Sequence, residues 1–302
     1  MKMKYKWTAK GLEIRGRYLW SAELVPVLHQ HLGVKSGMVA VDVGCGSGFF
    51  TRLIAKGLRS RGRVIGIDID QKLLVAARKI SKGENMSSLI EFKEGSAYSL
   101  PLPNGFADVV ACHTLLYFLE RPIKAIDEMM RVAKVGGRVV AVEPDYLGCV
   151  IYDPYDEDYV ELAYKFNNAV VGTFKKFYGA DLTVGSKLPS MFLKAGLADV
   201  RVQGYLLPTS PLSWYDRYSI EELVDYFKHS IDELNSWTEV EKRVMKEYGV
   251  SEGEFEEYRH KTVNRIRNWM KNPKKMRTHA FMSARCFLVA VGNKTHPAKL
   301  DT

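Results

Sequence analysis

Three glycines and two acids have the types and spacing that could hold a ligand. Gly44, Gly46 and Gly48 lie two residues apart in the segment VDVGCGSG, between a short apolar run and a helical pattern. A strand, turn and helix arranged in this way let the backbone approach a ligand closely and point helix N–H groups at it. Asp42 lies two residues before the first glycine, and Asp68 lies 20 residues after the third.

The spacing discriminates between classes of nucleotide ligand. The dinucleotide pattern G-x-G-x-x-G requires glycine at position 49, where this chain has Phe49. A carboxylate at Asp42 would repel a pyrophosphate and suits a cationic or zwitterionic ligand. Asp68 ends the run VIGID and can accept hydrogen bonds from two ribose hydroxyls, whereas Asp70 suits a helix N-cap better. The pattern therefore predicts a nucleoside-type ligand and argues against a hydride-transferring dehydrogenase.

Strands and helices alternate through the first half of the chain. Apolar runs predict strands at 37–44, 63–70, 89–95, 107–116 and 136–145, and helical patterns occupy 49–60, 71–81 and the segment from Pro122. Alternation at this spacing predicts right-handed βαβ units and an α/β fold with a doubly wound, mostly parallel sheet. Ligands of such sheets bind at the carboxyl ends of the strands.

The second half interrupts this pattern. Residues 146–183 and 208–280 are helical in pattern and are expected to be insertions that pack as a lid on the substrate side. A helix and strand over 186–207 and a strand over 284–294 complete the expected sheet. The expected domains are a basic helical segment at 1–36, the helical insertions, and a core built from 37–145, 184–207 and 281–294.

Four segments in order carry a resemblance. VDVGCGSGFFTRLIA, VIGIDID, EGSAYSLPLPNGFADVV and RVAKVGGRVVAVEPD resemble the successive motifs of class I S-adenosylmethionine-dependent methyltransferases over residues 38–145. Within that superfamily, these four segments are similar to the motifs of the ubiquinone/menaquinone-type, methyltransferase domain 11 group. The resemblance implies a seven-stranded Rossmann-like methyltransferase sheet, S-adenosylmethionine as cofactor and S-adenosylhomocysteine as product.

The resemblance also implies which residues hold the cofactor. The methionine part would lie against the loop from Asp42 to Gly48, Asp68 would hold the ribose, and Ile69 would flank the adenine. The cofactor residues implied are Asp42, Gly44, Cys45, Gly46, Gly48, Asp68, Ile69, Ser96, Ala97 and His113.

Two departures from the group limit what can be carried over. Ser96 stands where the group usually has an acid, so its hydrogen bond to the adenine amine would lack charge assistance. CHTLLYF replaces the D/N-P-P-Y/F tetrapeptide of many amino-methyltransferases that act on DNA bases and glutamine.

Residues near the ends of the fourth and fifth strands are candidates for the chemistry. His113 is either a general base for the acceptor or a wall residue bonded to a neighbouring carbonyl. Glu143 and Asp145 could accept hydrogen bonds from an amine, although Asp145 could instead cap the turn after Pro144. Three tyrosines could stack on a planar acceptor or belong to the core: Tyr117, Tyr146 and Tyr152.

Charge and cysteine content restrict the class of protein. The 302-residue chain has a formal net charge of +9. The four cysteines are far apart, without metal-ligand spacing, which predicts free thiols in a reducing cytoplasm and no metal site. No apolar run reaches the length of a membrane span, and no signal peptide is recognised. The oligomeric state stays open.

Positive charge is concentrated at both ends of the chain. Residues 1–17 contain six basic residues and one acid, Glu13, and residues 258–285 contain nine basic residues and no acid. A run of this kind is either a solvated face or a surface for an anionic polymer, such as RNA. The expected RNA contacts are Arg265, Arg267, Lys271, Lys274, Lys275 and Arg277.

Three functions fit these observations. The leading hypothesis is methylation of a base, at an exocyclic or ring nitrogen, in structured RNA, with ribosomal RNA favoured over transfer RNA. The alternative is a small-molecule methyltransferase that acts on a quinone precursor or another metabolite. The third class is a non-catalytic nucleotide-binding or protein-methylating role.

Overall fold

A computed structural model describes residues 8–20, 24–59, 61–208, 219–278 and 281–295. The described residues form two compact units by their backbone contacts. The sheet unit falls within Lys6–Glu143, Val184–Gly204 and Leu288–Thr302, and the helical unit falls within Pro144–Thr183 and Tyr205–Phe287.

One seven-stranded sheet organises the sheet unit. Its strands follow the order β3-β2-β1-β4-β5-β7-β6 and it is mostly parallel with one antiparallel hairpin. The strands are β1 (Val39–Val43), β2 (Arg63–Asp68), β3 (Ile90–Glu94), β4 (Ala107–His113), β5 (Ala133–Tyr152), β6 (Ala198–Pro208) and β7 (Met282–Asn293). The α/β fold class predicted from the sequence is confirmed.

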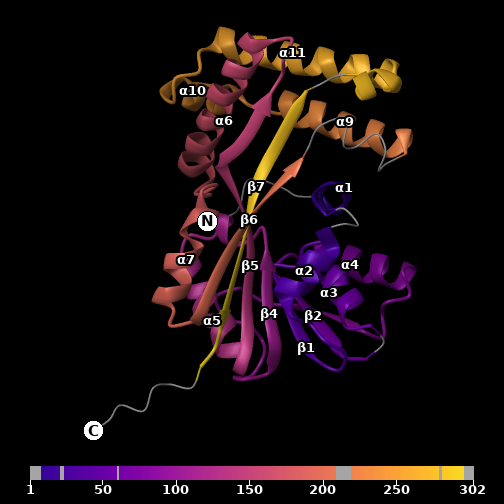
Figure 1. Ribbon diagram of the computed structural model, residues 1–302, viewed down its shortest axis with the longest axis vertical. Helices are drawn as coiled ribbons and strands as arrows, with labels where there is room; N and C mark the ends of the chain where they lie inside the picture. Colours follow the sequence, from indigo (N-terminus) through magenta and orange to yellow (C-terminus); the bar gives the residue numbers. More distant parts are fainter. Residues whose placement is uncertain (1–7, 21–23, 60, 209–218, 279–280, 296–302) are drawn as a thin grey trace. The chain divides into compact units, whose positions relative to one another are not determined.

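Helices flank this sheet (Figure 1). They are α1 (Ala9–Leu19), α2 (Leu24–Leu32), α3 (Phe49–Gly57), α4 (Gln71–Gly83), η1 (Leu116–Phe118), α5 (Pro122–Val132) and α7 (Val184–Lys194). α1 and α2 both contact α3, so the basic N-terminal segment includes two helices of the sheet unit. Asp70 caps α4 by accepting from the backbone N–H groups of Lys72 and Leu73, as expected.

The register of the sheet brings three strand ends together. Val43, the last residue of β1, pairs with Ile67 of β2 on one side and with Cys112 of β4 on the other. The strand order reverses between β2 and β4, with β1 at the switch. The carboxyl ends of these three strands are therefore the expected ligand position of a doubly wound fold.

One boundary was predicted wrongly. We expected β5 to end at residue 145 and a helical segment to follow, but β5 continues to Tyr152. The residues YLGCVIY favour a strand because they are rich in β-branched and aromatic side chains. Gly148 permits a close approach there, since a Cβ at this position would lie 2.8 Å from Cβ of Cys286 on β7.

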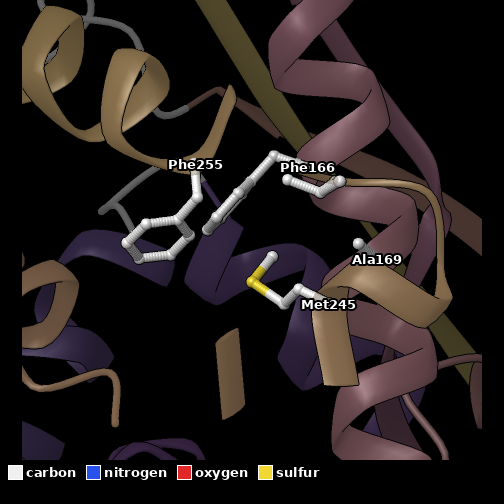
Figure 2. Close-up of a cluster of buried hydrophobic side chains, with 5 residues drawn as sticks. Phe166, Ala169, Met245 and Phe255 are labelled. Atoms are coloured by element: carbon white, nitrogen blue, oxygen red, sulfur yellow. The ribbon is translucent and has the colours of Figure 1, made fainter. Parts of the chain in front are cut away.

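The helical unit has its own hydrophobic core. Its helices are α6 (Glu157–Tyr178), α9 (Ile220–Asn235), α10 (Glu239–Glu247), α11 (Glu252–Lys271) and η2 (Pro273–Thr278). Figure 2 shows Phe166 and Ala169 of α6 packed with Met245 of α10 and Phe255 of α11. These four residues and Val250, each no more than 7% exposed, form what we call the helical core.

Several connections hold the ends of these helices. Capping boxes begin α10 at Thr238 and α11 at Ser251. A lysine–glutamate pair, Lys165 with Glu254, joins α6 to α11. No described helix is long and apolar enough to span a bilayer.

Truncation of the helical core should destabilise this unit. We expect Phe255→Ala to lower the free energy of unfolding by about 3–5 kcal/mol, because it deletes a fully buried ring between α6 and α10. Denaturant unfolding followed by near-ultraviolet circular dichroism measures the loss. Glu257→Ala, at an exposed position of the same helix, is the control. Equal stability of the two variants would contradict the assignment of Phe255 to a packed core.

Candidate functional site

The glycine loop between β1 and α3 has a left-handed backbone. Gly44, Gly46 and Gly48 have φ values of 73°, 54° and 80°. The N–H groups of Gly44 and Cys45 both donate to the carbonyl of Ile67, which ties the loop to the end of β2. Gly48 is the N-cap of α3. L-residues rarely adopt such φ values, so the glycine spacing read from the sequence is a backbone requirement.

Asp68 closes the loop from the end of β2. Its Oδ2 accepts a hydrogen bond from the N–H of Gly46 at 2.8 Å, and its Oδ1 accepts from the N–H of Asp70 at 2.9 Å. Burial raises the pKa of Asp68, although these backbone donors oppose the shift. Each carboxylate oxygen can accept a second hydrogen bond, so the group retains capacity for a ligand hydroxyl.

Asp42 lies beneath the loop and is 1% exposed. Its Oδ2 accepts from the hydroxyl of Thr51 on α3 at 2.6 Å, and its Oδ1 accepts no hydrogen bond from the described residues. Burial raises the pKa of Asp42 to about 7, and the neighbouring Asp68 adds to the shift. A buried carboxyl with an unsatisfied oxygen favours a cationic neighbour.

Helix α1 packs directly on the glycine loop. Glu13 accepts from the Ser47 hydroxyl at 2.7 Å and from Nη2 of Arg52 at 2.5 Å. Arg52 is 3% exposed and also donates to the carbonyl of Ser47. Leu12 reaches the loop as well, since its Cδ1 lies 3.0 Å from where a Cβ on Gly46 would lie. The sequence prediction missed Glu13, although a single acid among six basic residues was a signal.

Two further elements border the loop on the β2 and β3 side. Ile69, next to Asp68, exposes 69% of its surface and so presents an apolar side chain beside the loop. Ser96 and Ala97 are half-buried in the turn after β3. The Ser96 hydroxyl accepts from the N–H of Tyr98 at 3.2 Å and so shapes this turn.

His113 ends β4 within a group of aromatic rings. Its Nε2 accepts a hydrogen bond from Nε1 of Trp20 at 3.1 Å, and its ring stacks on Phe50 with 5.0 Å between centroids. Burial lowers the pKa of His113 to about 3, and the positive charge of Arg15 contributes. The imidazole is therefore neutral at physiological pH, with the lone pair of Nε2 engaged by Trp20. No sequence pattern pointed to Trp20, which is 93 positions from its partner.

Glu143 points into the protein and not toward an open site. It is 0% exposed, and its Oε1 accepts from the N–H groups of Leu115 and Leu116 at 2.9 and 2.8 Å. Tyr117 is 3% exposed and its ring lies 3.9 Å from that of Phe118, centroid to centroid. In this structure both residues are interior groups around η1, without a surface for an acceptor.

The remaining candidates for the chemistry belong to the helical unit. Asp145 accepts a hydrogen bond from the N–H of Leu147 at 3.1 Å. This bond fits the expected role of Asp145 as the cap of the turn after Pro144. Tyr146 lies under the guanidinium of Arg285, 5.3 Å from ring centroid to Cζ. Tyr152 is 53% exposed.

One of the six expected RNA contacts is engaged inside the helical unit. Arg265 pairs with the buried Asp153 at 2.7 Å and lies over the rings of Tyr159 and Phe281 at 4.0 and 4.8 Å. Its side chain is 11% exposed, so its prediction as a surface contact was wrong. Four others are exposed: Arg267, Lys271, Lys274 and Lys275. The side chain of Arg277 lies outside the described residues.

The sheet unit thus fits a zwitterionic nucleoside ligand. The glycine loop has the left-handed backbone typical of nucleotide-binding turns, Asp68 can accept hydroxyl hydrogen bonds, and Ile69 offers an apolar surface. The unsatisfied Oδ1 of Asp42 favours positive charge nearby. These four features meet at the carboxyl ends of β1 and β2.

Comparison with known proteins identifies the class. A family model described as a methyltransferase domain matches residues 41–141. The demethylmenaquinone methyltransferase of Lactococcus lactis is 30% identical over 191 residues, covering 61% of this chain and 74% of that protein. An uncharacterized 37.1 kDa protein in a Streptomyces fradiae transposon is 36% identical over 120 residues. That match covers 40% of this chain and 34% of the relative, so the chain spans about a third of this relative's length.

A solved structure supports the fold. The phosphoethanolamine N-methyltransferase 2 of Haemonchus contortus, in complex with S-adenosyl-L-methionine, aligns with a TM-score of 0.56 and 13% identity. The alignment covers 97% of this chain and 59% of that chain. The chain therefore belongs to the class I S-adenosylmethionine-dependent methyltransferases, as its motifs indicated. S-adenosylmethionine is the cofactor of this class.

The buried acid of the site should make stability depend on pH. The folded-state pKa of Asp42, about 7, lies above the unfolded value of about 4, so its contribution to stability is full below about pH 4 and is lost as the pH rises from there through 7. We expect the melting temperature to fall between about pH 5 and pH 7 and to level off above that, and Asp42→Asn to reduce this fall. Thermal unfolding monitored by circular dichroism at each pH tests the expectation.

Asp108→Asn is the matched control. The Lys134 ammonium and the Val39 N–H hold the pKa of Asp108 below its usual value despite desolvation, so this carboxyl titrates below the tested range. An unchanged pH slope in Asp42→Asn would contradict the prediction.

Proposed function

We propose that this protein transfers a methyl group from S-adenosylmethionine to a small-molecule acceptor, and that a quinone precursor is the first acceptor to test. The similarity to the Lactococcus lactis demethylmenaquinone methyltransferase, which extends over three quarters of that enzyme, carries the proposal. This is the alternative of the sequence analysis, and the similarity favours it over the RNA hypothesis.

The cofactor residues of the proposal are those implied by the motifs. The glycine loop with Asp42 would hold the charged amino-acid part, and Asp68 would hold the ribose hydroxyls. Ile69 and the Ser96 turn would border the adenine. When bound, S-adenosylmethionine supplies an electrophilic sulfonium methyl group.

The chain's own residues contribute binding and orientation more than proton transfer. His113 is neutral, and its Nε2 already accepts from Trp20. We infer that His113 forms part of the wall and does not act as the general base, the second of the two roles considered for it. Positioning a nucleophile about 3–3.5 Å from an electrophilic carbon can itself supply several kcal/mol of rate enhancement. An acceptor that reaches its nucleophilic form without a protein base, such as a phenol near its own pKa, suits this wall.

The charge of the chain gives the RNA hypothesis limited support. Arg265 is engaged within the protein, and the Lactococcus lactis relative is named for the methylation of a quinone precursor. Arg267, Lys271, Lys274 and Lys275 remain exposed, which is also expected of an ordinary solvated face.

The cofactor assignment predicts a specific loss of affinity. Asp68→Ala should weaken S-adenosylmethionine binding by at least about tenfold, because a hydrogen bond to a charged group contributes about 1.5–3 kcal/mol. Isothermal calorimetry gives the dissociation constant. Asp70→Asn, two residues away at a helix cap that asparagine can also serve, should bind normally. Equal affinity of Asp68→Ala and the native protein would refute the assignment.

The acceptor assignment predicts where a labelled methyl group goes. With S-adenosyl[methyl-³H]methionine, we expect label in a soluble demethylmenaquinone analogue that a chemical reductant keeps in its electron-rich quinol form, and not in ribosomal or transfer RNA from an unmodified source. Extraction into organic solvent separates the two products. Label in RNA alone would overturn the proposal in favour of the RNA hypothesis, and label in neither would overturn the quinone assignment.

A further inference from the structure

The turn after β4 is held by one buried carboxylate. Glu143 of β5 accepts from the N–H groups of Leu115 and Leu116, the two amides that open η1. The thiol of Cys112 lies 3.9 Å from the same oxygen, Oε1. Oε2 accepts no hydrogen bond from the described residues. One oxygen of a buried acid therefore fixes two consecutive peptide groups.

The residue before these amides has an unusual backbone. Thr114 has a φ of 51°, and its N–H donates to the carbonyl of Val142 at 2.9 Å. A β-branched residue in the left-handed region is a genuine outlier, and it persists where surrounding contacts over-determine the conformation. The Val142 carbonyl on one side of Thr114 and the Glu143 carboxylate on the other supply those contacts.

This turn touches both parts of the candidate site. The side chain of Leu115 packs on the glycine loop, since its Cδ1 lies 2.6 Å from where a Cβ on Gly44 would lie. His113, immediately before Thr114, carries the hydrogen bond from Trp20 and the stack on Phe50. A shift of the turn would therefore move the glycine loop and the aromatic wall together.

We propose that Glu143 is a positioning residue for methyl transfer: it holds Thr114 in the left-handed conformation and so fixes His113 and Leu115 against the cofactor and the acceptor. The inference rests on the proposed function and deepens it. Glu143 takes no part in proton transfer in this role, because its carboxylate acts through the peptide groups of Leu115 and Leu116. What matters is an accepting oxygen at Oε1, not a charge.

The conservative variant separates position from charge. Glu143→Gln retains an accepting oxygen, and its amide nitrogen takes the place of the unsatisfied Oε2. We expect Glu143→Ala to lower kcat by about 10- to 100-fold, the size of loss that misplaced reacting groups cause, and Glu143→Gln to restore most of it. Equal losses in Glu143→Gln and Glu143→Ala would overturn the proposal.

A second variant tests the strained backbone. Thr114→Gly removes the side chain that disfavours a positive φ, so the melting temperature should not fall. Because less strain then remains for the Glu143 carboxylate to oppose, Glu143→Ala should lower kcat less in the Thr114→Gly background than in the native one. Comparing the two backgrounds also cancels the loss of the contact between the Thr114 hydroxyl and Nδ1 of His113. An equal or larger loss in the Thr114→Gly background would overturn the proposal, and a double variant that folds where Glu143→Ala does not would support it.

Asp108→Ala is the matched control for a structural effect. Asp108 is also a carboxylate that accepts a backbone N–H, that of Val39 at 2.8 Å, but it lies near the start of β4, and His113 lies at the end. Its loss should lower stability and leave kcat near native. A loss of kcat as large as that of Glu143→Ala would show that general destabilisation explains both.

A readout independent of the acceptor separates this inference from the proposed function. In ¹⁵N-labelled protein, the Nε1–H resonance of Trp20 reports its hydrogen bond to His113. This resonance should shift in Glu143→Ala and stay in place in Glu143→Gln and Asp108→Ala. A native protein without methyl transfer would refute the proposed function alone, whereas an unmoved Trp20 resonance in Glu143→Ala would refute the positioning role.

Discussion

Each of the three glycines in the glycine loop faces a side chain from a different element of the sheet unit. A Cβ on Gly44 would meet Leu115 of the β4 turn, one on Gly46 would meet Leu12 of α1, and one on Gly48 would meet Phe92 of β3. Glycine is therefore required at these positions for two reasons: the backbone is left-handed, and a Cβ would collide with the packed side chains. Because α1, β3 and the β4 turn all close on one short loop, the geometry of the whole site depends on it.

The sequence predicted what short-range patterns encode. Alternation of strands and helices gave the sheet, and the glycine spacing with Asp42 and Asp68 gave the cofactor class. The sequence did not predict contacts between residues far apart in the chain, such as Trp20 with His113 and Glu13 with Arg52. The direction of Glu143 depends on the pleat: His113 pairs with Val142, so the next residue along β5 points to the opposite face. The face of the sheet to which Glu143 points can therefore be assigned only when the register of β4 and β5 is known.

Charge along the chain is a weak guide to the cations that a folded surface presents. The segment 258–285 contains no acid in sequence, yet acids from elsewhere reach into it. Asp153 and Asp156 pair with Arg265 and Lys261 of α11, and Glu256 pairs with Arg259. The number of basic residues in a segment is therefore not the number of cations available to an anionic ligand. Fold and cofactor follow from local rules, whereas the acceptor depends on side chains that tertiary structure alone brings together.

The raised pKa of Asp42 links the occupancy of the site to protons. At neutral pH a good part of the molecules hold a proton on this carboxyl, since its pKa is about 7. A cation bound beside it favours the ionised form and expels that proton into solvent. By thermodynamic reciprocity, the affinity for a cationic ligand then rises with pH up to the region where Asp42 is already ionised. Methyl transfer removes the sulfonium charge but leaves the amino-acid part intact, so the carboxyl would take its proton back only when the product leaves, and product release and protonation would favour one another.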